Sequence, residues 1–176
     1  MRIFIAILFT ALFTSNVHSQ KCWKPRNVNY IITKVACKAN TNIIKYDAWQ
    51  LNYKNLKKIA AKAKPQSLNF DNIIIELPFE NASIRKFRIY DSETMTPDLA
   101  KQFPNIKSYY GECVDDKLIK VRIDFNDLGF HALISNSQGL QWLVEPFCIS
   151  TKQFYCSYSK TDYKSEREPF NEDRRR

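Results

Sequence analysis

The stretch "IKVRIDFNDLGFHALIS", residues 119–135, decides the fold. Apolar and polar side chains alternate through its first half, as they do in a β-strand that buries one face. "NDLG" then supplies turn residues, and "FHALIS" continues as a second apolar run. The stretch therefore predicts two adjacent antiparallel strands. The core face of the first is expected to consist of Ile119, Val121, Ile123 and Phe125, and the other face of Lys120, Arg122 and Asp124.

Further strands are predicted on both sides of this pair. Short apolar or alternating runs occupy residues 72–78, 84–90, 140–146 and 153–159. In the N-terminal arm, "VNYIITKVA" (28–36) also predicts a short strand. Together these segments indicate an antiparallel meander or a sandwich-like sheet.

Two segments have helical features instead. Residues 51–64 repeat apolar groups at helical spacing and end at Pro65. In "TPDLAKQFP" (96–104), Thr96 can cap a short helix and Pro97 suits its first position. We therefore expect one mainly β (α+β) domain with two short helices.

Residues 1–19 have the layout of a secretory signal peptide. Arg2 precedes an apolar run, and "VHS" (17–19) offers a cleavage site before Gln20. The run is too short for a membrane anchor. We expect a secreted protein, extracellular or periplasmic, with cleavage near Ser19–Gln20 and no membrane span.

The chain is basic, with a formal net charge of +9. A basic excess can indicate nucleic acid, an anionic surface or an acidic protein as the partner. Here the lysines are scattered, as in "YKNLKKIAAKAK" (53–64), and the tight cluster is residues 174–176. Export and the lack of an RNA-binding signature oppose a nucleic-acid partner. We interpret the charge as a solvated surface.

The sequence lacks the motifs of common catalytic sites. After signal cleavage one histidine remains, His131, so an H-E-x-x-H zinc site cannot form, and no G-x-S-x-G elbow accompanies it. Three widely spaced glycines cannot form a phosphate loop. Asp115 and Asp116 are typical of a turn in which carboxylates cap backbone N–H groups. We expect no enzyme activity and no cofactor.

Five cysteines in an exported chain favour disulfides and leave one thiol over. Cys148 and Cys156 flank a loop between two predicted strands, and Cys22 and Cys37 bracket the predicted N-terminal strand. Both pairings are hypotheses, and other pairings stay open. They leave Cys113 as the candidate free thiol.

Four segments, taken in order, resemble one known kind of module. They are "FRIYDSETMTPDLAKQFPNIKSYYGECVDD" (87–116), "VRIDFNDLGFHALI" (121–134), "VEPF" (144–147) and "YCSYSKTD" (155–162). This order resembles the N-terminal pro-domain of secreted bacterial reprolysin-like (adamalysin-type) zinc metalloproteases. The resemblance covers about residues 46–163. It divides the chain into a signal peptide (1–19), an N-terminal arm (20–45), this module (46–163) and a charged flexible tail (164–176).

The resemblance implies an accessory role. Such pro-domains precede a catalytic zinc domain, assist its folding and keep it latent. The chain stops where that domain would be expected, so a truncated or split precursor is one interpretation. The first hypothesis is a secreted, non-catalytic module that binds a secreted zinc metalloprotease and chaperones it or keeps it latent, with Tyr109, Tyr110 and Arg122 as partner contacts. The alternative is a small exported β-rich binding or structural module with no protease partner.

Cys113 departs from the family pattern, which has a small residue at this place. We expect Cys113 on an exposed turn after Gly111, beside Glu112. A thiolate there could ligate the zinc of a metalloprotease, but acidic neighbours disfavour thiolate. Steric cover of the active-site cleft is therefore the preferred mechanism, with zinc ligation as the alternative.

Overall fold

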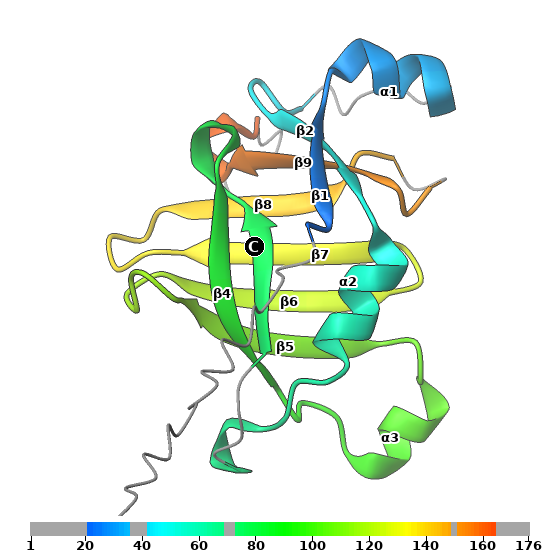
Figure 1. Cartoon of the computed structure of the whole chain (residues 1–176), viewed down its shortest axis with the longest axis vertical. Coiled ribbons are helices and arrows are strands. Elements are labelled where there is room, and N and C mark those ends of the chain that lie inside the picture. Colours follow the sequence, from blue (N-terminus) through cyan, green and yellow to red (C-terminus); the bar gives the residue numbers. More distant parts are fainter. Residues whose placement is uncertain (1–20, 36–41, 69–72, 149–150, 165–176) are drawn as a thin grey trace, which may run out of the picture.

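The computed structural model describes residues 21–35, 42–68, 73–148 and 151–164. Its strands form one antiparallel sheet in the order β1-β2-β9-β8-β7-β6-β5-β4-β3 (Figure 1). The strands are β1 (Trp23–Arg26), β2 (Asp47–Leu51), β3 (Ile73–Pro78), β4 (Ile84–Asp91), β5 (Lys107–Cys113), β6 (Lys120–Asn126), β7 (Gly129–Ser135), β8 (Gln141–Pro146) and β9 (Phe154–Ser159). The described helices are α1 (Val28–Val35), α2 (Tyr53–Ala60) and α3 (Pro97–Gln102). The prediction of a mainly β, antiparallel, single-domain fold is confirmed.

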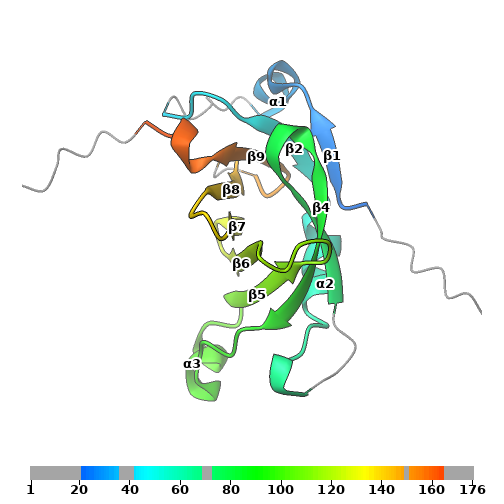
Figure 2. The ribbon, with the colours of Figure 1, turned by 90° about the vertical axis from the view of Figure 1, so that its left-hand side faces the viewer.

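The sheet curls so strongly that its two edge strands meet. β3 and β4 lie across β5–β8, and Figure 2 shows the two halves of the sheet facing one another. At the edges, Trp23 Nε1 of β1 donates a hydrogen bond of 2.7 Å to the carbonyl oxygen of Glu76 in β3. The curl therefore encloses an interior that is lined by both halves of the sheet.

The main hydrophobic core fills this interior. Alternate residues of each strand point inward, as the two-residue period of a strand requires. On β6 and just before it, the predicted core face is confirmed, since Ile119, Val121, Ile123 and Phe125 are all buried. Lys120, Arg122 and Asp124 are exposed on the other face, which is also as predicted.

Helices α2 and α3 form where helices were predicted. Asn52 caps α2 by accepting a hydrogen bond from Asn55 N, and the helix packs Leu56 and Ala60 into the core. Thr96 caps α3 by accepting from Leu99 N, with a proline at the start of the helix. Neither cap depends on tertiary contacts, so the sequence could show both.

Helix α1 corrects the prediction of a strand over residues 28–36. Its β-branched composition is typical of a strand, but Val28, Ile31 and Val35 repeat at helical spacing. Asn27 begins the helix, because its side chain accepts from Asn29 N at 2.8 Å. The apolar stripe covers the outer side of β9 in a second hydrophobic cluster, where Ile31 is fully buried. Burial of this stripe outweighs the weak local preference for a strand.

Strand β5 corrects the predicted turn at Gly111. Residues 109–113 pair with β4 and residues 107–112 with β6, and the chain turns only after Cys113. In that turn Asp116 accepts a hydrogen bond from Leu118 N, the role expected of its carboxylate. Glycine is needed at position 111 because the backbones of β5 and β4 approach closely there, and not because the chain turns. An added Cβ would lie 2.2 Å from the carbonyl oxygen of Arg88.

Candidate binding surface

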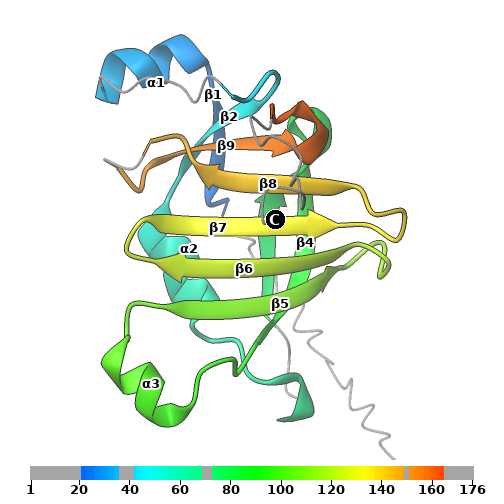
Figure 3. The same cartoon turned by 180° about the vertical axis from the view of Figure 1, so that it is seen from behind.

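A row of side chains crosses the outer face of the sheet at one level of the strand register. Tyr90 of β4 lies opposite Tyr110 of β5, which lies opposite Arg122 of β6. Arg122 in turn pairs with Leu133 of β7, and Leu133 pairs with Leu143 of β8. We call these five residues the outer row. Figure 3 shows β5–β8 from this side, with no described helix lying across them.

The middle of the outer row combines an aromatic ring with an exposed cation. The Tyr110 ring stacks on Tyr90 at a centroid distance of 5.4 Å, and its hydroxyl donates to Gln66 Oε1 at 2.9 Å. Tyr110 is 37% exposed, so a fixed ring still reaches solvent. Arg122 is exposed and has no hydrogen-bond or ion-pair partner within the described part of the chain. A guanidinium beside rigid apolar groups is suited to a carboxylate on another molecule.

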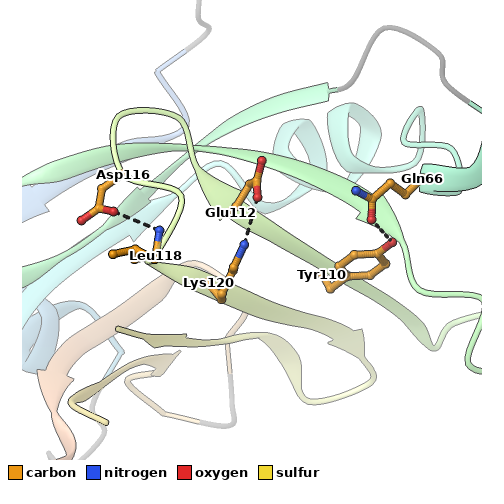
Figure 4. A network of polar contacts seen from close by, with 6 residues as sticks. All are labelled: Gln66, Tyr110, Glu112, Asp116, Leu118 and Lys120. Atoms are coloured by element: carbon orange, nitrogen blue, oxygen red, sulfur yellow. Dashed lines mark hydrogen bonds and ion pairs between the residues drawn. The ribbon is translucent and has the colours of Figure 1, made fainter. Parts of the chain in front are cut away.

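Charged residues flank the row on the same face. Lys120 Nζ lies 3.0 Å from Glu112 Oε2, and Figure 4 shows this pair beside Tyr110. Such an exposed pair contributes up to about 1 kcal/mol, so its main effect is to orient the two side chains. On the other side of the row, Asp124 accepts a hydrogen bond from Ser108. The nearby carboxylates are therefore engaged, whereas Arg122 is not.

Tyr109 does not belong to this surface, which corrects its assignment as a partner contact. It is 5% exposed and packs edge-on against Phe125 inside the curl. Burial, with a smaller contribution from the charge of Asp91, raises the pKa of Tyr109 to about 12. Because successive side chains of a strand point to opposite faces, Tyr109 and Tyr110 cannot both face a partner.

Cys113 is likewise buried, so the prediction of an exposed thiol is wrong. It ends β5 with 0% exposure, opposite Phe87, and its backbone N–H donates to the carbonyl oxygen of Ile119. Its sulfur is part of the main core. A thiol in this position cannot reach a metal on another protein unless β5 opens.

The strand register does not bring Cys148 and Cys156 together. Cys156 lies opposite Glu145, three residues before Cys148 in the chain. Cys148 lies beyond the end of β8 at Pro146, so the register of β8 with β9 does not include it. The structure therefore gives no support to this pairing, and burial raises the pKa of the Cys156 thiol to about 12.

Cys22 lies at the start of the fold, and its predicted partner Cys37 lies outside the described residues, as does the predicted signal peptide. The Cys22 sulfur accepts a hydrogen bond of 3.4 Å from Asn55 Nδ2. Burial is the main reason that the pKa of this thiol is raised. The pairing of Cys22 with Cys37 stays a prediction.

His131 lies on the outer face, opposite Asp124 of β6. Its Nε2 is buried and has no hydrogen-bond partner in the described structure. Within the same residues, no group of three or more His, Cys, Asp or Glu side chains is arranged to hold a metal ion. No described helix is long and apolar enough to cross a bilayer.

Sequence reasoning identified Tyr110 and Arg122 but missed Tyr90, Leu133 and Leu143. The alternation of β7 and β8 could have placed both leucines on the outer face. Their alignment with Arg122 depends on strand register, which the sequence does not state. No family model, curated protein or solved structure matches the chain.

Proposed function

We propose that this chain is a secreted, non-catalytic module that binds the catalytic domain of a secreted zinc metalloprotease through the outer row, and keeps that domain latent or assists its folding. The choice of partner rests on the resemblance of residues 46–163 to reprolysin-type pro-domains. The choice of surface rests on the geometry of the outer row.

The observation that carries the proposal is the exposed Arg122, which lies between Tyr110 and Leu133 and has no ion-pair partner among the described residues. Arginine and tyrosine are enriched among the residues that dominate binding energy at protein interfaces. The Tyr110 ring is already held by Tyr90 and Gln66, so little side-chain entropy is lost when a partner docks on it. The surface fits a partner that presents a carboxylate surrounded by apolar side chains.

Latency would come from steric cover. A sheet face that lies over the active-site cleft excludes substrate without any chemistry of its own. Ligation of the partner's zinc by Cys113 is disfavoured, because that sulfur is buried in the core. Inhibition by this module should therefore depend on the outer row and not on a thiol.

A titration of enzyme activity tests the proposal. A catalytic domain with an H-E-x-x-H-x-x-G-x-x-H motif, encoded in the same genome, is mixed with the purified chain, and cleavage of a peptide substrate is measured. We expect saturable inhibition that Cys113→Ser changes by no more than a few-fold. Tyr110→Ala should weaken it by about tenfold or more, the loss of about 1.4 kcal/mol.

Two results would count against this function. Inhibition abolished by Cys113→Ser, in a variant whose thermal unfolding matches that of the wild type, would indicate zinc ligation. Absence of both binding and inhibition with every such catalytic domain of the genome would favour the module without a protease partner.

A further inference from the structure

Lysines from three separate segments line two adjoining, largely open depressions, together called the hollow, at the start of α2. Lys21 and Lys24 come from the start of β1, and Lys54 and Lys58 from α2. Lys152 reaches the hollow from the loop before β9. The hollow has two parts, of about 770 and 610 Å³, which share Lys21, Asn52 and Lys54. We call it the lysine groove.

Strand pairing creates this arrangement. Trp23 lies opposite Leu51, so β1 begins where β2 passes into α2, and Figure 1 shows the two places side by side. Asn52 N donates to the carbonyl oxygen of Cys22 at 2.8 Å, which fixes the junction. Lysines that are far apart in the sequence therefore share one surface, and the charge is more concentrated than the sequence suggested.

The positive charge of the groove exceeds the negative charge near it in the described chain, where Glu76 and Asp127 lie close to the lining residues Cys22 and Tyr53. The residues that line its two parts include no aspartate or glutamate. The ion pairs of the described residues are Lys101–Asp98 and Lys120–Glu112, and both lie elsewhere. Lys152 is the one lysine of the groove with a described contact, since its Nζ lies 5.5 Å from the centre of the Tyr53 ring and donates to Asn126 O at 3.5 Å.

Two amide side chains of the groove, those of Gln50 and Asn52, have their oxygens engaged. Gln50 Oε1 accepts from Arg26 Nε at 2.9 Å and Nη2 at 2.6 Å. Asn52 Oδ1 accepts from Asn55 N at 3.2 Å. Because both oxygens are engaged, each amide has its two N–H donors left to offer. A ligand rich in acceptors and negative charge matches this lining.

We propose that the lysine groove binds an acidic oligosaccharide, a sugar chain that carries carboxylate or sulfate groups. Lysine ammonium groups would pair with the acid groups, and the amides of Gln50 and Asn52 would donate to sugar oxygens. A single-stranded nucleic acid fits less well, because such sites use exposed aromatic rings for stacking. The aromatic ring of the groove, Tyr53, lies under Lys152 and packs against Phe125.

Binding of defined sugar chains to the full-length secreted chain tests the proposal. The probes are oligogalacturonate, which is carboxylated, a heparin oligosaccharide, which is sulfated, and neutral dextran of similar length. Calorimetry at low salt should detect binding of at least one acidic chain and none of dextran. Binding should weaken as salt is raised, because screening acts on exposed charges. The preferred acidic chain distinguishes carboxylate from sulfate recognition.

The variant Lys54→Glu/Lys58→Glu locates the site. Both lysines are exposed. An acid at position 54, in the first turn of α2, is favourable, and an acid at position 58, in the last turn, is unfavourable by a similar small amount, so the variant should fold about as well as the wild type. We expect its affinity for the acidic chain to fall by about tenfold or more. The control Lys107→Glu/Lys117→Glu makes the same change in net charge at exposed positions outside the groove and should retain binding.

Three outcomes would overturn the proposal. The first is the absence of binding to either acidic chain at low salt. The second is an equal loss of affinity in the control variant, which would indicate non-specific attraction. The third is tighter binding of a single-stranded oligonucleotide or of phosphatidylglycerol vesicles through the same lysines, which would assign the groove to another class of partner.

Discussion

Replacement of Gly111 by alanine should disrupt the sheet where β5 pairs with β4. The new Cβ would lie 2.2 Å from the carbonyl oxygen of Arg88 and 3.1 Å from the Cα of Ile89. Unstrained carbon contacts begin at about 3.5 Å, so β5 would have to move by roughly 1 Å. The clashing atoms belong to backbone and cannot rotate away.

The expected cost follows from that movement. Overpacking a core costs about 1–3 kcal/mol, and each ladder hydrogen bond that is lost costs about 1 kcal/mol more. We therefore expect Gly111→Ala to lower the free energy of unfolding by about 3 kcal/mol or more. For a chain of this size, that corresponds to a fall in Tm of about 6–12 °C. Urea unfolding followed by tryptophan fluorescence measures the change.

Gly139 provides the control. It has a φ of +80°, and an added Cβ would have no atom within 4 Å, so its only requirement is the left-handed backbone. Gly139→Asn should be nearly neutral, since asparagine tolerates this conformation. If Gly111→Ala unfolded at the same urea concentration as Gly139→Asn, the close approach of β4 and β5 would be wrong.

Three further predictions concern the core. Ile123→Ala should lower the free energy of unfolding by about 2–5 kcal/mol, because the side chain is fully buried. Lys120→Ala should lower it by less than about 1 kcal/mol. Equal effects of the two variants in urea unfolding would mean that β6 is misassigned. Burial raises the pKa of Tyr109 from 10.0 and of Cys156 from 9.0, each to about 12. The stability that these two side chains contribute is therefore complete below about pH 9 and is lost as the pH rises through 12. An unfolding free energy that stayed constant over this pH range would contradict their burial. Cys113 should resist alkylation in the native chain and react after unfolding, and rapid native labelling measured by mass spectrometry would refute its place in the core.

The parts of the fold that the sequence could predict are those in which local pattern and burial agree. Apolar and polar residues alternate along β6, and its polar face is open to solvent. The two-residue period and the pattern of burial therefore both indicate a strand. The Thr96 cap and the proline that follows it are local signals for α3. These elements needed no information about neighbours in space.

The sequence predictions are wrong where contacts with residues distant in the sequence determine the local structure. Helix α1 is rich in β-branched residues, and its helical form depends on the outer side of β9, which its stripe covers. At Gly111 the sequence indicates a turn, because glycine has two structural uses and the second, close backbone approach, depends on the position of β4. The predicted turn at Gly111 is also the reason that Cys113 is predicted at the surface, although it lies in the core.

The candidate sites were only partly predictable for the same reason. Alternation alone places Arg122 on the polar face of β6, but the outer row also requires the register of four strand pairs. The lysine groove joins Lys21, Lys54 and Lys152 through the pairing of β1 with β2 and the position of the loop before β9. Both surfaces are products of long-range pairing.

The most direct test of the central claim is the affinity of the purified chain for the catalytic domain of a secreted zinc metalloprotease, measured for Arg122→Glu against Lys117→Glu. Both side chains are exposed, and neither has a described partner, so the thermal unfolding of both variants should match the wild type. The outer row predicts that Arg122→Glu raises Kd by about thirtyfold or more, equivalent to about 2 kcal/mol, while Lys117→Glu leaves it unchanged. Equal affinities for wild type and Arg122→Glu would contradict it.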